Sequence, residues 1–111
     1  EVFKGSIVAY SSDVKRALLN TPDVPSVSQA AAEAMAIGAC RALNADIGLA
    51  VTGEAGPDPL EEEVGRVWMA TSIGGVVKSS TVKWPFDRER IRQFTTITVL
   101  NALRLRLEDE I

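Results

Sequence analysis

Hydrophobic and polar positions follow different periods along the chain, and each change of period predicts a new element of secondary structure. Residues 5–11, GSIVAYS, form a short run rich in β-favouring residues, which indicates a strand. Residues 12–20, SDVKRALLN, open with a good N-cap residue and carry apolar side chains at helical spacing. Residues 21–28 contain two prolines and indicate a loop. The chain therefore opens with a strand followed by a helix.

The next segment predicts a long helix. Ser26 or Ser28 can cap its N-terminus, and Asn44 is placed to end it. Small and apolar residues recur at helical spacing between these limits, so we expect one face of the helix to pack on a core. The expected stripe includes Ala31, Met35, Ala39 and Leu43.

Three strands are expected in the middle of the chain. Residues 45–52, ADIGLAVT, are polar only at their start, which is typical of a central strand covered on both faces, and we expect this strand to be parallel to residues 5–11. The segments GRVWMATSIGG and VVKSSTVKW are joined around Gly74 and Gly75, a pair that favours a two-residue hairpin turn. The second of these strands is therefore antiparallel to the first.

The last segment predicts a long helix that begins near Asp87. Its arginines are expected to face outward, and its inward positions include Ile91, Phe94, Thr98 and Leu105. The order of strands and helices predicts an α/β protein, a three-layer α/β/α sandwich with a mixed sheet. No repeat or low-complexity linker interrupts residues 1–111, so we expect one domain.

Composition narrows the class of protein. A chain of 111 residues with 46% apolar content can build one hydrophobic core. The net charge of −3 and the absence of a basic stripe argue against a nucleic-acid partner. No apolar run is long enough to span a membrane, and the start of the chain, EVFKGS, does not resemble a signal peptide. We therefore expect a cytoplasmic protein with neither nucleic acid nor membrane as partner.

Two kinds of chemistry are made improbable by the residue types present. The chain has no histidine and a single cysteine, Cys40. Without a histidine, Cys40 lacks the usual base of a catalytic cysteine, and its alanine-rich surroundings favour a small buried apolar residue. The same absences argue against a zinc site. We expect neither a metal nor another cofactor.

The stretch AVTGEAGPDP, residues 50–59, ends an apolar strand in a glycine- and proline-rich turn. Ligands of open α/β sheets bind beyond the carboxyl ends of parallel strands. If the first and the central strand are parallel, one crevice collects Tyr10, Ser11, Thr52, Gly53 and Gly56. Gly53 and Gly56 can take positive φ values and bring backbone N–H groups close to an anionic ligand. The alternative is a turn that only terminates a strand.

Lys15 supplies a second candidate for this crevice. It stands four residues after Ser11, in the first turn of the expected helix 12–20. The helix dipole and burial both lower the pKa of a lysine at such a place, so a neutral amine there could act as a general base. The alternative is a solvated lysine on a helix surface, and the neighbouring hydroxyl groups are equally ordinary as capping residues.

Four blocks of the chain together resemble a known family: FKGSIVAYSSDVKRALLNTP, VSQAAAEAMAIGACRALNADIGLAVTGEAGP, VGRVWMAT and WPFDRERIRQFTTITVLNAL. In this order and spacing they resemble the C-terminal domain of the CinA family of competence/damage-inducible proteins, which is similar to nicotinamide-nucleotide amidohydrolases of the PncC type. The resemblance covers nearly the whole chain. It implies an α/β/α fold and metal-free hydrolysis of the carboxamide of nicotinamide mononucleotide to nicotinic acid mononucleotide and ammonia.

The resemblance also implies roles for individual residues. Lys15 would be the base that activates a nucleophilic hydroxyl group, with Tyr10 and Ser11 as its neighbours. The substrate pocket would include Ser11 together with Thr52, Gly53, Ala55 and Gly56. Asp87 and Arg88 match an Asp-Arg pair of the family at the start of the last helix, where helix capping is the simpler role.

This chain departs from the family pattern in two places. The family carries its nucleophilic serine in a Glu-Ser-Cys-Thr-Gly-Gly motif before the first block, and the 111 residues contain no such motif. The acidic run DPLEEE replaces a glycine-rich segment, and as a solvated loop it has no effect on ligands, whereas beside the crevice it would repel a phosphate. Three classes stay open: an amidohydrolase domain with its nucleophile upstream, a non-catalytic nucleotide-binding module, and an interaction domain.

Association is the last expectation. The chain corresponds to the family domain without its N-terminal strand and helix, and an open sheet lacking these would expose unpaired backbone groups and apolar side chains. We therefore expect either a homodimer or a preceding segment that covers the sheet. The contact is expected at VWMATSI or on the final helix, where Ile97, Leu100 and the leucines of the stretch 103–107 exceed the needs of a one-sided stripe.

Overall fold

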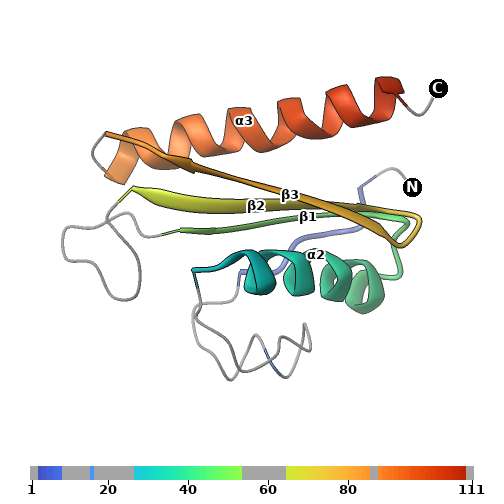
Figure 1. The fold of residues 1–111 in the computed structure, drawn as a ribbon. Helices are drawn as coiled ribbons and strands as arrows, with labels where there is room; N and C mark the ends of the chain where they lie inside the picture. The colour runs from blue at the N-terminus through green and yellow to red at the C-terminus, as the bar shows by residue number, and fades with distance from the viewer. Residues whose placement is uncertain (1–2, 9–15, 17–26, 54–64, 86–87, 110–111) are drawn as a thin grey trace.

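The computed structural model describes residues 3–8, 16, 27–53, 65–85 and 88–109. These residues form two helices and three strands, and Figure 1 shows the helices on opposite faces of the sheet. The α/β class and the arrangement of a sheet between two helix layers are therefore confirmed. In chain order the elements are α2 (Gln29–Leu43), β1 (Ile47–Gly53), β2 (Arg66–Ile73), β3 (Val76–Lys83) and α3 (Arg88–Asp109).

The three described strands form one sheet in the order β1-β2-β3. Both pairings are antiparallel, and Ile73 of β2 stands opposite Val76 of β3 across a two-residue turn. Gly74 and Gly75 fill this turn with φ values of 56° and 85°, which suit a hairpin turn that only residues tolerant of positive φ can form. The expected hairpin is confirmed.

The expected first strand is a correction in its described part, and a parallel pairing of residues 45–52 with residues 9–11 lies outside the described residues. Residues 45–52 were expected at the centre of a mixed sheet, but β1 is antiparallel to β2 and lies at one edge of the described sheet. Residues 5–8 of the expected first strand lie in no strand, and residues 9–11 are outside the described part of the chain. On β1 the α2 side is buried at Gly48, Ala50 and Thr52, whereas on the side of α3 Leu49 is half-buried and Ile47 and Val51 are exposed. Of the expected helix 12–20 only Arg16 is described, and it is helical.

Helix α2 begins and ends at the residues that the sequence indicates. The Ser28 side chain accepts a hydrogen bond of 3.1 Å from the Ala31 N–H, and Asn44 ends the helix in the left-handed conformation with φ 51°. The helix packs on the sheet through its smallest residues: Ala32 and Ala36 form a buried cluster with Ala50 and Ala70. A Cβ atom on Gly48 of β1 would overlap the backbone oxygen of Ala36 and lie 2.7 Å from Cys40 Sγ, so only glycine allows helix and strand to approach this closely.

A second buried cluster lies on the other face of the sheet, under α3. It joins Val67 and Met69 of β2 to Ile91 and Val99 of α3, with Leu49 of β1 packed against it. The inward position of Ile91 is thus confirmed. Strand β2 contributes to the buried clusters on both faces of the sheet, so it lies at the centre of the described core.

The orientation of α3 departs from the expected one at several positions. Phe94 and Leu105 were expected to face inward, but they are 41% and 47% exposed, and Thr98 is half-buried. The arginines were expected to face outward, but Arg106 is only 5% exposed. The buried stripe instead runs through Ile91, Thr95, Val99 and Arg106, which are spaced in steps that match the helical period.

Arg106 is buried because it provides donors to the hairpin end of the sheet. Its Nη1 donates to the backbone oxygen of Thr71 at 2.7 Å and to Thr71 Oγ1 at 2.8 Å, and its Nη2 donates to the backbone oxygen of Val76 at 2.6 Å. One side chain of α3 therefore binds both strands of the hairpin. The desolvation cost of a buried guanidinium is offset by these short, charge-assisted hydrogen bonds.

Candidate functional site

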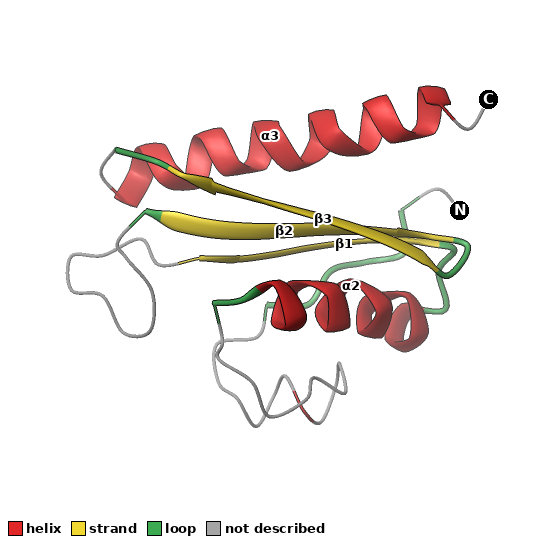
Figure 2. Ribbon diagram, viewed as in Figure 1, coloured by secondary structure: helices red, strands yellow, loops and turns green. Residues whose placement is uncertain are grey.

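One end of the sheet brings together features that suit a polar ligand. The last residues of β1 and β3 lie at this end, and both α2 and α3 begin there (Figure 2). The N-terminus of a helix carries unused backbone N–H groups and a partial positive charge. This end, opposite the Gly74–Gly75 turn, is therefore the described part of the molecule best suited to an anionic group.

Thr52 and Gly53 are the two predicted site residues that the structure describes, and they end β1 at this place. Thr52 is only 7% exposed and lies on the α2 side of the sheet, like Gly48 and Ala50, which precede it with the same alternation. Its hydroxyl group is thus held by the sheet rather than by a loop.

Gly53 does not have the conformation that we expected. It lies in the extended strand and is not among the glycines with a positive φ. Position 53 favours glycine because there is little room for a side chain: a Cβ atom would lie 2.9 Å from Val67 Cγ2 and 3.3 Å from the backbone oxygen of Arg66. The absent side chain lets β1 end close against the start of β2.

Trp68 lies beside this strand end. It is the residue of β2 that stands opposite Thr52, and its indole ring packs against the cluster under α2. Its Nε1 atom is buried and has no hydrogen-bond partner among the described residues. A buried donor without an acceptor is costly, so an acceptor from outside the described residues would stabilise this position.

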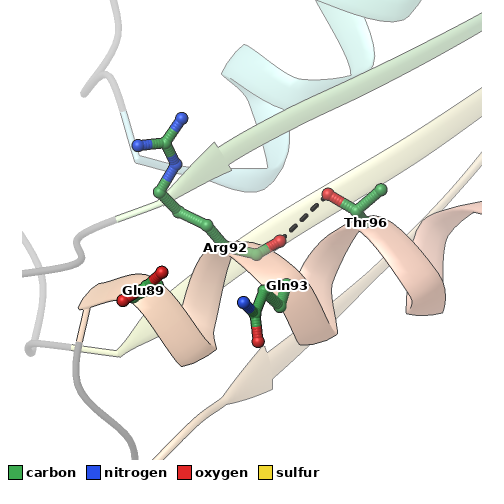
Figure 3. Close-up of a pocket in the computed structure, with 4 residues that line it drawn as sticks. All are labelled: Glu89, Arg92, Gln93 and Thr96. Atoms are coloured by element: carbon green, nitrogen blue, oxygen red, sulfur yellow. Dashed lines mark hydrogen bonds between the residues drawn. The ribbon is translucent and has the colours of Figure 1, made fainter.

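A groove on the first turns of α3 provides charged and polar groups at the same end of the sheet. Among described residues it is lined by Glu89, Arg92, Gln93 and Thr96, and its volume is about 540 Å³ (Figure 3). The Thr96 hydroxyl donates to the backbone oxygen of Arg92 at 2.9 Å. Arg92 and Gln93 project from the helix in different directions, so the groove offers a guanidinium and an amide group on separate sides (Figure 3).

The groove lies on the flank of α3 that faces β1. The other flank is occupied by the residue after β3: the ring of Phe94 lies 5.7 Å from that of Trp84, whose Nε1 donates to Thr95 Oγ1 at 3.1 Å. The four groove residues have the spacing i, i+3, i+4 and i+7, which places them together on one side of a helix. Arg92 is therefore turned toward the edge of the sheet where Thr52 and Gly53 end β1.

This arrangement can bind a ligand that has both an anionic and an amide-like part. A guanidinium binds phosphate or carboxylate oxygens through a planar pair of donors, and an amide side chain offers one donor group and one acceptor. Outside the groove, one hydroxyl–carboxylate pair is present among the described residues: Ser79 Oγ donates to Glu33 Oε2 at 2.6 Å between β3 and α2. The described part of the chain contains no group of three or more potential metal ligands.

The other predicted site residues cannot be compared with the structure. Tyr10, Ser11, Lys15, Ala55 and Gly56 lie outside the described residues, as does Asp87. The structure thus places Thr52 and Gly53 at one end of the sheet and leaves their expected neighbours as predictions. None of the described helices is long and apolar enough to cross a membrane.

The groove residues of α3 were missed by the sequence interpretation. Their signal was present: polar side chains recur at helical spacing through DRERIRQFTT, on a flank distinct from the apolar one. The apolar pattern of the helix predicts outward-facing arginines and gives no indication of a groove. Only the placement of this flank toward the end of β1 distinguishes the groove from an ordinary helix surface.

The described elements define an α/β domain in which polar side chains gather at the end of the sheet where β1 ends. Comparison with known proteins identifies the family: the model of the CinA C-terminal domain matches residues 1–107. The chain belongs to this family. It is 40% identical to a CinA-like protein of Dictyoglomus turgidum and 39% identical to one of Solibacter usitatus, covering 94% and 96% of this chain. In both cases the chain spans only 27% of the relative's length.

Solved structures agree with this assignment. The competence damage-inducible protein A from Klebsiella pneumoniae is 28% identical, with a TM-score of 0.85 over 89% of this chain and 66% of that chain. The competence/damage inducible protein CihA from Agrobacterium tumefaciens is 33% identical, with a TM-score of 0.79 over 87% of this chain and 64% of that chain. The described fold is therefore a CinA-family fold, present here as about two thirds of the length of those chains.

Proposed function

We propose that this domain binds nicotinamide mononucleotide at the end of the sheet where β1 ends, and that it serves hydrolysis of the nucleotide's carboxamide in the complete protein. The observation that carries the proposal is that β1 ends with Thr52 and Gly53 at the end of the sheet where α2 and α3 begin, one on each face, with the Arg92 groove on the first turns of α3, in a CinA-family domain. Each of these features suits a phosphate, an amide or both.

The nucleotide's two polar ends match the two kinds of group at this site. Its phosphate suits the guanidinium of Arg92 and the helix N-termini, because both provide positive charge and N–H donors. Its carboxamide needs neutral donors and acceptors, which hydroxyl groups such as that of Thr52 provide. The buried, unpartnered Nε1 of Trp68, opposite Thr52 in the sheet, offers a further donor on the same side.

The proposed reaction adds water to the carboxamide carbon, breaks the C–N bond and releases ammonia, leaving nicotinic acid mononucleotide. In the mechanism implied by family resemblance, Lys15 removes the proton from a hydroxyl nucleophile, with Tyr10 and Ser11 beside it. That hydroxyl attacks the carbonyl carbon, and water then hydrolyses the resulting ester. No metal is needed, because the base and backbone N–H donors supply the proton transfer and the charge stabilisation.

Binding can be tested by isothermal titration calorimetry with nicotinamide mononucleotide and with nicotinamide riboside, which lacks the phosphate. We expect the mononucleotide to bind more tightly, and Arg92→Gln to weaken its binding about 10-fold, as the loss of one charge-assisted contact implies. The matched control is Arg41→Gln, which changes an exposed arginine in the last turn of α2 and should leave affinity unchanged. Equal effects of both substitutions would contradict a role for the groove.

Turnover can be tested by ammonia release from the complete protein. We expect Lys15→Ala to lower kcat about 100-fold or more, which is the contribution typical of a general base. Lys78→Ala, at an exposed position of β3, is the control and should leave kcat unchanged. A nearly normal rate for Lys15→Ala would exclude Lys15 as the base, and nucleotide binding without ammonia release would favour the non-catalytic binding module.

A further inference from the structure

Two opposite charges on the first turns of α3 are left unpaired. Glu89 and Arg92 both line the groove and stand three residues apart, a spacing at which side chains of one helix can bind each other. Near the end of the same helix such a pair does form, with Arg104 Nη1 2.8 Å from Glu108 Oε1. Within the described part of the chain, however, neither the Glu89 carboxylate nor the Arg92 guanidinium has an ion-pair or hydrogen-bond partner. Both charges are therefore available to a ligand.

The groove presents these charges at separate places. Figure 3 shows the Arg92 side chain extending away from the helix, whereas Glu89 lies by the first turn. Gln93 and Thr96 add an amide and a hydroxyl group to the lining. A ligand with negative charge alone would be attracted by Arg92 but repelled by Glu89. The groove is therefore complementary to a ligand that carries both a negative and a positive charge.

Nicotinamide mononucleotide is such a ligand. Its phosphate is negative, and the nitrogen of its ring is bonded to the ribose, which makes the ring a pyridinium cation. One ribose unit separates the two charges, and Cβ atoms of residues three apart on a helix are separated by a comparable distance of about 5–6 Å. A carboxylate beside the pyridinium ring stabilises it, whereas a carboxylate gains no such attraction from the uncharged ring of the reduced nucleotide or from the neutral base of other mononucleotides.

We propose that Glu89 selects the pyridinium ring, so that the groove binds the oxidised, cationic form of the nucleotide in preference to its reduced form and to mononucleotides with a neutral base. This inference rests on the proposed function, because it takes the phosphate to bind at Arg92. Arg92 then strengthens the binding of every mononucleotide, and Glu89 determines which of them binds best. The two charges have separate effects that can be measured independently.

A purely structural role of Glu89 has a different consequence. Glu89 lies in the first turn of α3, where an acidic side chain stabilises a helix through its dipole. Loss of that interaction would lower the stability of the helix and weaken the binding of all ligands alike. The ratio between two affinities is unaffected by such a change, so this ratio is the quantity that reports selection.

Isothermal titration calorimetry of the complete protein measures the ratio. The ligands are nicotinamide mononucleotide, its reduced form and uridine monophosphate, and the protein carries Lys15→Ala so that the nucleotide is consumed slowly during the titration. We expect the oxidised nucleotide to bind about 5-fold more tightly than each of the other two, as one partly exposed charge pair implies.

Substitutions on α3 separate the two charges. Glu89→Gln keeps the shape of the side chain and removes its charge, so it should reduce the ratio to below about 2-fold, whereas Glu89→Asp keeps the charge and should retain most of the ratio. Glu108→Gln is the matched control: it removes an acidic group that is 59% exposed at the far end of α3 and should leave the ratio unchanged. Arg92→Gln should weaken the binding of all three ligands about 10-fold and also leave the ratio unchanged, because all three carry a phosphate.

Three results would overturn the inference, and they differ in what they say of the proposed function. A ratio that Glu89→Gln leaves unchanged would exclude selection by Glu89, while binding of nicotinamide mononucleotide in the same titrations would leave the proposed function standing. A ratio reduced equally by Glu108→Gln would assign the preference to the net charge of the domain. Absence of nicotinamide mononucleotide binding, both with and without Lys15→Ala, would contradict the proposed function and this inference together.

Discussion

Replacing Arg106 with methionine tests whether this buried arginine connects α3 to the hairpin. Methionine keeps most of the length and apolar volume of the arginine stem, so the substitution removes the donors without leaving a large cavity. Three short hydrogen bonds disappear, two to Thr71 and one to the backbone oxygen of Val76. The acceptors stay in place in a region that excludes water, since Arg106 is only 5% exposed.

The expected change in the free energy of unfolding follows from two opposing effects. Each hydrogen bond to a charged group contributes about 1.5–3 kcal/mol, and the acceptors left behind carry a desolvation cost. The burial cost of the guanidinium disappears at the same time, which recovers several kcal/mol. We therefore expect a net loss of about 3 kcal/mol in the free energy of unfolding, out of a total of about 5–15 kcal/mol for a domain of this size.

Thermal and urea unfolding followed by circular dichroism measure this loss. A decrease of about 3 kcal/mol corresponds to a fall in Tm of about 10–15 °C. Arg104→Met is the control on the same helix: its side chain is 58% exposed and pairs with Glu108, so its loss should cost less than about 1 kcal/mol. Equal stability of the two variants would refute the argument that Arg106 connects helix and hairpin.

Two further substitutions test the packing and the capping of α2. Gly48→Ala should lower the free energy of unfolding by about 2 kcal/mol, because its Cβ atom would overlap the backbone oxygen of Ala36. A Tm equal to that of the native protein would contradict the close approach of α2 to β1. Ser28→Ala should cost about 1 kcal/mol in urea unfolding through loss of the cap on Ala31 N–H, while Ser80→Ala, at an exposed position of β3, should be neutral; equal losses would refute the cap.

Local signals were sufficient to predict most of the elements. Ser28 and Asn44 define the ends of α2 because capping depends on a few neighbouring residues. Gly74 and Gly75 define the hairpin for the same reason, since a two-residue turn requires positive φ values. Both predictions are confirmed, because a helix cap and a two-residue turn depend on neighbouring residues and not on distant packing contacts.

The arrangement of the strands and the facing of α3 depend on distant contacts, and the sequence interpretation was wrong there. The apolar run of β1 indicated a central strand covered on both faces, but β1 lies at the edge of the described sheet, and Ile47 and Val51 on its α3 side are exposed. Arg106 has the spacing of the buried stripe, and its charge made it look like a surface residue. Its acceptors, at Thr71 and Val76, are 35 and 30 residues away and carry no local signal.

The candidate site, too, was predicted from local signals in one part and missed in another. The turn after Thr52 and Gly53 was recognisable because glycine and proline end an apolar strand abruptly. Arg92 was not, because its importance comes from the side of α3 that faces β1, and that orientation follows from the contact of Phe94 with Trp84 on the other flank. Lys15, Tyr10 and Ser11 stay predictions based on family resemblance.

The most direct test of the proposed site is a titration of the ¹⁵N-labelled protein with nicotinamide mononucleotide, followed by amide chemical shifts. We expect shift changes for Thr52 and Gly53, for the first turn of α2 and for Arg92, Gln93 and Thr96 in the groove of α3. The amides of Gly74 and Gly75, at the opposite end of the sheet, should stay unchanged. Shift changes confined to the hairpin end, or none with saturating nucleotide, would contradict a nucleotide site at the end of β1.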